Sequence, residues 1–450
     1  MELGGGRMER IMKRIVLALM ILVSVFFDRN VGNADPVNPE VELQEIINRS
    51  DSNQTVVLPP GTYQGPISIN KRITLQGEGV TLINDSQEPA VSIQSDGVVL
   101  QGIQIEHQGS GESAGILIGS NHVTIKNTSI HTRGYGIMLR DSNQSVIQNN
   151  RISWIKSDAA HPESKGNGID LYNSHSIQVI NNVISYVRDG IYMEKGRNET
   201  VKGNEISFSR YGVHCMYIGD SQVTGNVGQS NFTGAMVMVV TNSNITNNSF
   251  RMQSGNVYSQ GIFLYDVRST YVSKNQVAEN RVGIYMENAT ENEIEDNTLS
   301  RNFIGIQMIN ATENGIRRNH FLTNVIEASA KDSKNNQMDE NYWDSFQGID
   351  LTKDGASDIP YAINPFYQGV VSVNSAYQLF FQSPGMTFLS SMFTYGRSQW
   401  ATDHSPLMNM TEVARNEPHP SESNRIVSRI SPVLFILATF TIVYFGRIRR

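Results

Sequence analysis

The sequence NVISYVRDGIYMEKGRNETVKGN (182–204) continues as NEISFSRYGVHCMYIGDSQVTGN (204–226), and the two stretches share one pattern. Each runs from asparagine to asparagine, with a glycine at the same place, and the pattern repeats after 22 residues. The glycines recur as Gly136, Gly168, Gly190, Gly212, Gly234, Gly261, Gly283 and Gly305. The asparagines recur as Asn150, Asn182, Asn204, Asn226, Asn248, Asn275, Asn297, Asn319 and Asn341. A period of this length indicates a solenoid in which each coil stacks on the next.

Within each coil, the residues one and three positions after the glycine are apolar, as in Ile191 and Met193 or Val213 and Cys215. Because successive side chains of a strand point to opposite faces, these residues must point toward one core. The short strands and the absence of helical periodicity predict an all-β, right-handed parallel β-helix with three strands per coil. The stretch LPPGTYQGPISINKRITLQGEG (58–79) resembles the opening coils of pectate-lyase-type β-helices.

Both ends of the chain carry apolar segments. Arg10, Lys13 and Arg14 precede the apolar run 15–27, which predicts a signal peptide, with an uncleaved membrane anchor as the alternative. A second apolar run, 433–445, precedes terminal arginines and predicts a tail anchor that holds the body on the outer face of the cytoplasmic membrane. We therefore expect five segments: signal peptide 1–34, β-helix 35–362, C-terminal extension 363–410, polar linker 411–429 and transmembrane tail 430–446.

Charge and cysteine content exclude some classes of protein. The net charge of −7 gives no reason to expect nucleic-acid binding, and the single cysteine, Cys215, excludes an intramolecular disulfide framework. The phase of Cys215 points its thiol into the core.

Two recurring polar features have structural explanations. The asparagines are expected to hydrogen-bond as a ladder along one corner of the stack, where asparagine also tolerates the left-handed turn conformation. Asp350, Asp354, Gly355 and Asp358 are similar to a calcium loop, but Tyr361 stands where a bidentate glutamate belongs. We expect a turn stabilised by aspartates and no calcium.

The residues two and four positions after each glycine point away from the core and map one flank of the solenoid. On two consecutive coils these residues are His214 with Met216 and Met236 with Met238. Stacking brings the four side chains within reach of one ion, and thioethers with an imidazole suit Cu(I). An apolar docking patch is the equal alternative. The flanking aromatic residues Tyr192, Phe263 and Tyr265 are the predicted partner-docking residues.

Specific strings on and beyond this flank resemble the NosD family of β-helical accessory proteins. These strings are RYGVHCMY (210–217), GAMVMV (234–239) and NYWDSFQGIDLTKDGASDIPY (341–361), followed by SPGMTFLSSM and DHSPLM. His214, Met216 and Met236 fall on the family's H-x-M and following methionine positions, whereas Met238 comes from the spacing alone. The loop 350–361, which we call the aspartate loop, departs from the D-x-D-x-DG string of relatives.

The resemblance implies a non-catalytic, exported subunit that supports assembly of the copper–sulfide centre of nitrous oxide reductase. Its implied partners are an ABC-type ATPase and a membrane permease (NosF- and NosY-like), a copper chaperone lipoprotein (NosL-like) and the reductase itself. The protein would act by docking the reductase or the copper chaperone, and it would also handle Cu(I) itself.

Two other readings remain open. The opening coils and the fold are common among polysaccharide lyases, epimerases and glycosidases, which need a convergent acid and base. The outward acids Asp170, Glu194 and Glu287 are widely spaced along the sequence, so we expect no such convergence and no enzyme. A purely structural surface protein is the third reading, and the outward histidine and methionines argue against it.

Overall fold

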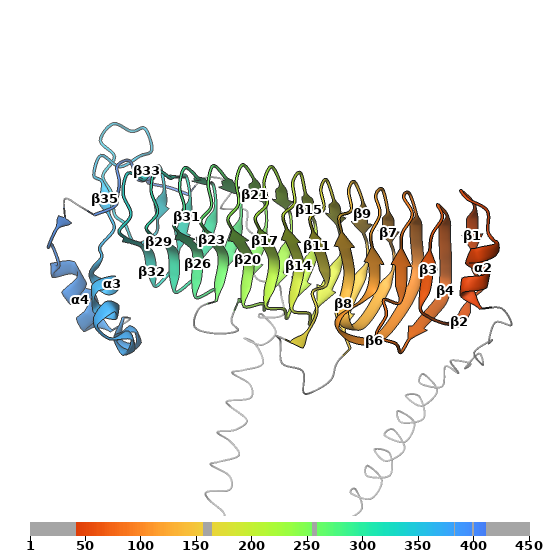
Figure 1. Cartoon of the computed structure of the whole chain (residues 1–450). Coiled ribbons are helices and arrows are strands. Elements are labelled where there is room, and N and C mark those ends of the chain that lie inside the picture. Colours follow the sequence, from red (N-terminus) through yellow and green to blue (C-terminus); the bar gives the residue numbers. More distant parts are fainter. Residues whose placement is uncertain (1–41, 156–163, 254–258, 382, 398–399, 411–450) are drawn as a thin grey trace, which may run out of the picture.

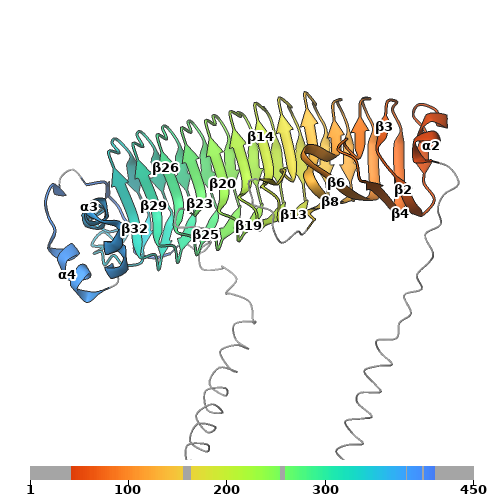
Figure 2. The ribbon, with the colours of Figure 1, turned by 60° about the horizontal axis from the view of Figure 1, so that its bottom comes forward.

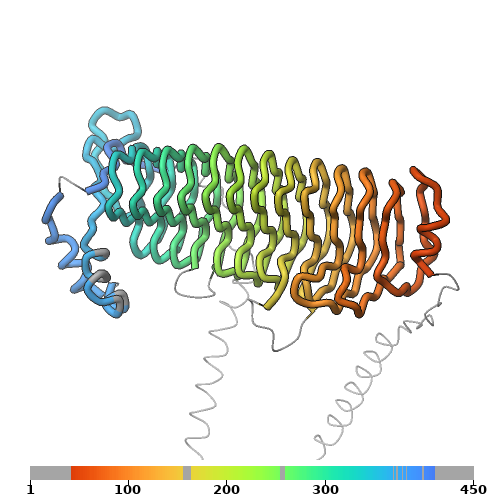
Figure 3. Tube along the Cα trace, viewed as in Figure 1, coloured from red at the N-terminus to blue at the C-terminus, as the bar shows by residue number. Residues whose placement is uncertain are grey.

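The computed structural model describes residues 42–155, 164–253, 259–381, 383–397 and 400–410. These residues form a parallel β-helix whose coils follow one another along a single axis (Figure 1). The tube along the Cα atoms shows the coils as a regular stack from the N-terminal to the C-terminal end (Figure 3).

Each complete coil contributes one strand to each of three parallel stacks, as predicted from the repeat. We call the first stack the glycine face, because its strands lie at the repeat glycines: β11 (Ile169–Tyr172), β14 (Asp189–Glu194), β17 (Tyr211–Met216), β20 (Thr233–Met238), β23 (Gln260–Tyr265), β26 (Val282–Glu287), β29 (Ile304–Ile309) and β32 (Ile326–Lys331).

The second stack comprises β9 (Val146–Gln148), β12 (Gln178–Ile180), β15 (Thr200–Lys202), β18 (Gln222–Thr224), β21 (Asn244–Thr246), β24 (Tyr271–Ser273), β27 (Glu293–Glu295), β30 (Gly315–Arg317) and β33 (Gln337–Asp339). The third comprises β10 (Arg151–Trp154), β13 (Val183–Ser185), β16 (Glu205–Ser207), β19 (Val227–Gln229), β22 (Ser249–Arg251), β25 (Gln276–Ala278), β28 (Thr298–Ser300), β31 (His320–Leu322) and β34 (Tyr342–Trp343).

The opening coils are less regular and contain longer strands that bend around the corners. These strands are β1 (Thr55–Val57), β2 (Gly61–Gln64), β3 (Ile67–Ile69), β4 (Thr74–Asn84), β5 (Val91–Ile93), β6 (Val99–Ile118), β7 (Thr124–Lys126) and β8 (Ser129–Arg140). The end of β8 pairs with β11, so the glycine face extends back into this region.

The core consists of the alternate residues that the repeat assigns to it. Ile191 and Met193 of β14 are fully buried, and Val213 and Cys215 of β17 lie directly above them in the stack. The inward phase of Cys215 is therefore confirmed, and burial raises the pKa of its thiol to about 12. A thiol in this environment stays protonated and is a poor metal ligand.

The repeated asparagines form the predicted ladder. Asn226 Nδ2 donates to Asn248 Oδ1 at 3.0 Å and to the carbonyl of Val201 at 3.0 Å, and every ladder asparagine repeats this arrangement. The prediction was wrong in one detail, because the left-handed residue is the one before the ladder asparagine, as at Asn247 and Lys274. The ladder asparagine itself satisfies buried backbone groups.

The two ends of the solenoid are covered differently (Figure 2). At the N-terminal end, α2 (Leu43–Arg49) buries Leu43 and Ile47 against the first coils. At the other end lie α3 (Phe366–Val373), the 3₁₀ helix η2 (Ser375–Phe380) and α4 (Pro384–Met392). The strands β35 (Tyr361–Ala362) and β36 (Thr402–Asp403) pair antiparallel there, and β36 also continues the second stack.

Asp403 ends the asparagine ladder. Its Oδ2 accepts hydrogen bonds from Asn341 N and Asn341 Nδ2, at 3.1 and 3.0 Å, and from Trp343 Nε1 at 2.9 Å. A carboxylate can do this because it only accepts hydrogen bonds, so the donors at the open end of the ladder all find a partner.

The aspartate loop is a turn in which aspartate side chains accept hydrogen bonds from backbone amides of the same loop. Asp350 accepts the amide hydrogens of Lys353 and Gly355 at 2.6 and 3.1 Å, and Asp358 accepts that of Leu351 at 2.6 Å. The expected turn stabilised by aspartates is therefore present.

The predicted signal peptide, polar linker and tail anchor lie outside the described residues. None of the helices in the described part of the chain is long and apolar enough to cross a membrane. The two insertions of the repeat fall between β10 and β11 and between β22 and β23, hence at the same corner of the coil, as expected.

Candidate functional site

The predicted His–Met cluster, His214, Met216, Met236 and Met238, lies at the middle of the glycine face. The parallel pairing of β17 with β20 places His214 beside Met236 and Met216 beside Met238. The register deduced from the repeat is therefore the register of the structure.

The cluster is less exposed than its outward phase implied. His214 and Met236 are only 6% and 9% exposed, whereas Met216 and Met238 are half-buried. The expectation that all four side chains form a solvent-facing surface was wrong for His214 and Met236. Aromatic neighbours cover the imidazole: the rings of Tyr192 and Tyr211 meet it edge to face, with centroids 4.9 and 5.0 Å away. Large side chains on adjacent strands thus enclose an outward-pointing residue without placing it in the core.

His214 is oriented by a buried carboxylate that the sequence analysis missed. Its Nδ1 lies 2.9 Å from Oδ2 of Asp189, and Arg210 binds the same carboxylate through Nε and Nη2 at 2.8 and 2.7 Å. Burial raises the pKa of Asp189, but the hydrogen bonds from His214 and Arg210 outweigh burial and hold the pKa below its usual value. Because an ionised carboxylate only accepts hydrogen bonds, His214 must carry a proton on Nδ1.

The other ring nitrogen of His214 has no hydrogen-bond partner. Nε2 is buried and unpaired within the described residues. Leaving a buried polar atom unpaired costs about 1–3 kcal/mol, and such an atom in a native structure calls for a ligand or a functional explanation.

Tyr192 connects the cluster to an acid on its own strand. Its hydroxyl donates to Glu194 at 2.7 Å and lies 3.5 Å from Met216 Sδ. Burial, and then the hydrogen bond to Glu194, raise the pKa of Tyr192. The phenol is therefore neutral and packs one side of the cluster.

The other predicted docking residues lie on the opposite side. Phe263 pairs with Met236 and Tyr265 with Met238. Phe263 stacks on Tyr285 with centroids 4.6 Å apart. The three docking residues are all half-buried, so aromatic rings flank the methionines on both sides.

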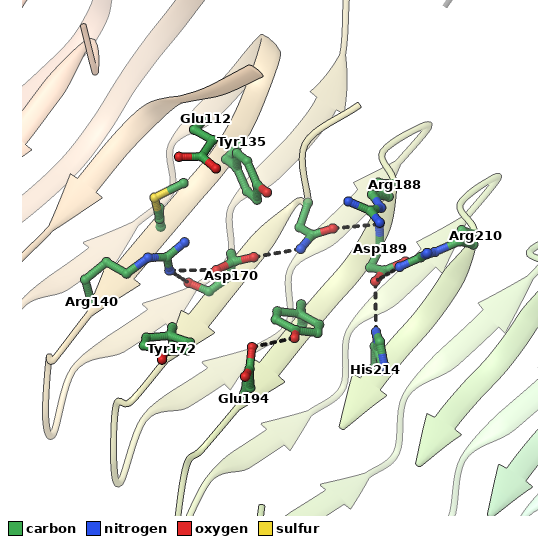
Figure 4. Close-up of a pocket in the computed structure, with 13 residues that line it drawn as sticks. Glu112, Tyr135, Arg140, Asp170, Tyr172, Arg188, Asp189, Glu194, Arg210 and His214 are labelled. Carbon is green, nitrogen blue, oxygen red and sulfur yellow. Dashed lines mark hydrogen bonds and ion pairs between the residues drawn. The ribbon is translucent and has the colours of Figure 1, made fainter. Parts of the chain in front are cut away.

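A pocket of about 570 Å³ adjoins the cluster (Figure 4). Its charged lining includes Asp170, Asp189, Arg140, Arg188, Arg210 and His214. Glu194 lines it as well, so Asp170 and Glu194 share one site. The expectation that acids and bases do not converge was therefore wrong for these two acids, because parallel stacking turns a separation of one coil in sequence into adjacent strands.

Asn167 joins the two aspartates of this pocket. Its Nδ2 donates to Asp170 Oδ2 at 2.6 Å, and its Oδ1 accepts the amide hydrogen of Asp189 at 3.1 Å. Arg140 binds Asp170 Oδ1 at 2.6 Å. Burial raises the pKa of Asp170, although Arg140 and Asn167 oppose this effect.

The fold defines a class before any relative is considered: a parallel β-helix protein with a His–Met cluster on its glycine face and a pocket beside that cluster. A family model described as "Right handed beta helix region" matches residues 77–227. A second model, "Periplasmic copper-binding protein (NosD)", matches residues 153–353, which contain the whole His–Met cluster.

Two relatives agree with that match. The "Probable ABC transporter binding protein NosD" of Pseudomonas aeruginosa is 26% identical over 148 residues, which cover 32% of this chain and 34% of the relative. The protein of the same name from Stutzerimonas stutzeri is 26% identical over 140 residues, which cover 30% and 31%. The chain is therefore similar to NosD proteins, and it spans about a third of the length of the curated relatives it matches.

The chain also has partial similarity to solved structures of other proteins. The A-module of the mannuronan C-5 epimerase AlgE6 of Azotobacter vinelandii has a TM-score of 0.49 and 15% identity, covering 63% of this chain and 89% of the module. A family 28 exopolygalacturonase of Yersinia enterocolitica has a TM-score of 0.48 and 11% identity, covering 65% and 74%.

Proposed function

We propose that this protein is a non-catalytic exported subunit of an ABC-type maturation complex, NosDFY-like, which supports assembly of the copper–sulfide centre of nitrous oxide reductase. Two facts support the proposal. The NosD family is described as periplasmic and copper-binding, and both relatives are named as ABC transporter binding proteins. The specific partners are an ATPase, a permease, a copper chaperone lipoprotein and the reductase.

One observation carries the proposal at the level of the residues: Nε2 of His214, beside Met236, is buried and has no partner in the part of the chain that the structure describes. Metal-binding histidines usually donate their second ring N–H to a carboxylate, which fixes the tautomer and makes the free nitrogen a better ligand. Asp189 supplies that carboxylate here. The lone pair of Nε2 is therefore ready for a cation.

The donor set fits copper as cargo. His214 offers an imidazole nitrogen, and Met216, Met236 and Met238 offer thioethers, a soft combination that suits Cu(I) and not calcium or magnesium. No group of three or more histidine, cysteine, aspartate or glutamate side chains that could hold a metal is present among the described residues. Methionines are therefore central to the proposal.

The different exposure of the four cluster residues suggests how copper is exchanged. Met216 and Met238 are half-buried, whereas His214 and Met236 are buried. A copper chaperone docked on Tyr192, Phe263 and Tyr265 would meet the more accessible thioethers first. The flat aromatic surroundings suit such docking.

The test is Cu(I) affinity measured by competition with a chromogenic chelator on the exported protein. We expect His214→Gln and Met236→Leu each to weaken Cu(I) binding about tenfold or more, because each removes one ligand and nearly preserves side-chain volume. Met193→Leu is the matched control, since Met193 points into the core one strand away. Equal affinity in all four proteins would refute the site.

A further inference from the structure

Arg188 is the one arginine of the pocket beside the cluster that no carboxylate neutralises within the described residues. Arg140 is paired with Asp170 and Arg210 with Asp189. Arg188 forms no ion pair there, and its Nε is buried without a hydrogen-bond partner. The pocket therefore offers one uncommitted guanidinium, whose forked geometry matches a carboxylate.

The remaining polar groups of the pocket are suited to hydroxyls. Glu112 is exposed on the pocket lining, beside Tyr135, and Glu194 lies on β14 (Figure 4). Carboxylates accept hydrogen bonds from hydroxyl groups, whereas several in one pocket repel a ligand with more than one negative charge. Burial raises the pKa of Tyr135, so its phenol is a neutral donor.

Aromatic rings complete the lining. Tyr135, Tyr172 and Tyr192 contribute to the walls. Such rings pack against the C–H faces of a saturated ring while their hydroxyls meet polar groups. The volume of about 570 Å³ falls within the range of small-molecule sites.

From this combination we infer that the pocket binds a sugar acid, namely a single hexuronate, with its carboxylate on Arg188 and its hydroxyls toward Glu112 and Glu194. A phosphate or nucleotide fits less well, because its greater negative charge would face four carboxylates with only one free arginine. The inference does not depend on copper handling, since Arg188 and Glu112 lie outside the His–Met cluster.

The experiment compares ligands that differ only in the carboxylate. Binding of galacturonate and of its neutral counterpart galactose is measured by titration calorimetry on the exported protein. We expect saturable binding of the uronate alone. Arg188→Gln should weaken it about tenfold or more, the loss expected for one charged hydrogen bond, and Arg188→Lys should weaken it less.

A second variant and a second readout keep the test decisive. Glu112→Ala changes an exposed residue, so it should fold normally, and it should weaken uronate binding because it removes a hydrogen-bond acceptor. Arg188→Gln should leave Cu(I) affinity unchanged, and Met236→Leu should leave uronate affinity unchanged. The inference is overturned if neutral galactose binds as well as galacturonate, if galacturonate binding does not saturate, or if Arg188→Gln binds galacturonate with wild-type affinity.

Discussion

Glu199 is a buried acid whose protonation should control the pH dependence of stability. It is 1% exposed, its Oε2 accepts the amide hydrogen of Ile177 at 2.9 Å, and its Oε1 has no partner among the described residues. Burial raises its pKa from 4.5 to about 8, although the hydrogen bond from the amide of Ile177 opposes the shift. The native protein therefore keeps a proton on Glu199 that the unfolded chain has lost.

The sign and size of the effect follow from that difference. Between about pH 4.5 and pH 8, the native state holds one proton more than the unfolded state, so stability falls as the pH rises. The slope is about 1.4 kcal/mol per pH unit, which gives an upper bound of about 5 kcal/mol across the window. Below the window the penalty disappears, because both states are protonated.

Glu199→Gln should remove this slope. Asn292 occupies the position equivalent to Glu199 at the same corner of a later coil, and its Nδ2 donates to the carbonyl of Val267 at 2.8 Å. For position 199 the equivalent carbonyl is that of Ser174. A glutamine amide can donate there at every pH, whereas an ionised glutamate cannot. The variant should match the wild type near pH 5 and exceed it near pH 8.

The measurement is chemical denaturation at pH 5, 6, 7 and 8, followed by far-ultraviolet circular dichroism. Glu205→Gln is the matched control, because Glu205 is exposed on the following strand of the same coil. Differences between variants are compared, since solenoids need not unfold in one step. An unchanged pH slope in Glu199→Gln would show that the native glutamate is not held protonated.

Four further changes test the ladder and the site. Asn226→Ala, in the middle of the ladder, should destabilise the protein by about 2–4 kcal/mol in denaturation, because it leaves buried donors and acceptors unpaired on both sides. Asp403→Leu should cost a similar amount and expose the last coil first in hydrogen exchange, because four donors lose their acceptor, the fourth being the amide of Ser405. Cys215→Ser should leave Cu(I) affinity unchanged, and the native thiol should resist alkylation near neutral pH because its pKa is about 12. Asp189→Asn should weaken Cu(I) binding about 10–100-fold without removing a ligand, because it no longer fixes the tautomer of His214.

The repeat was sufficient to predict the fold and much of its internal register. Gly212 and Gly234 fixed the phase of their strands, and that phase correctly placed Cys215 inside and His214 beside Met236. A solenoid allows this because each coil contacts only its neighbours, so one count along the chain gives the spatial neighbours of every residue.

Exposure could not be predicted in the same way. The alternation of side chains along a strand predicts the face of the sheet from which each one projects. The burial of that side chain depends on the size and rotamers of the side chains on adjacent coils. Tyr192 and Tyr211 cover His214 because both turn toward it, a choice that alternation does not specify.

Part of the pocket was missed because Arg188, Asp189 and Arg210 precede the repeat glycine, whereas the candidate positions were taken from those that follow it. Directly before the glycines stand Tyr135, Asn167, Asp189, Tyr211, Thr233, Gln260, Val282 and Ile304. Asp189 is the one acid in that series, and it both orients His214 and binds Arg210. The backbone of a regular solenoid is fixed by strand pairing and ladders, so a residue that breaks the pattern without changing the fold is free to serve a site. In such proteins, the departures from the repeat are therefore better pointers to function than the repeat itself.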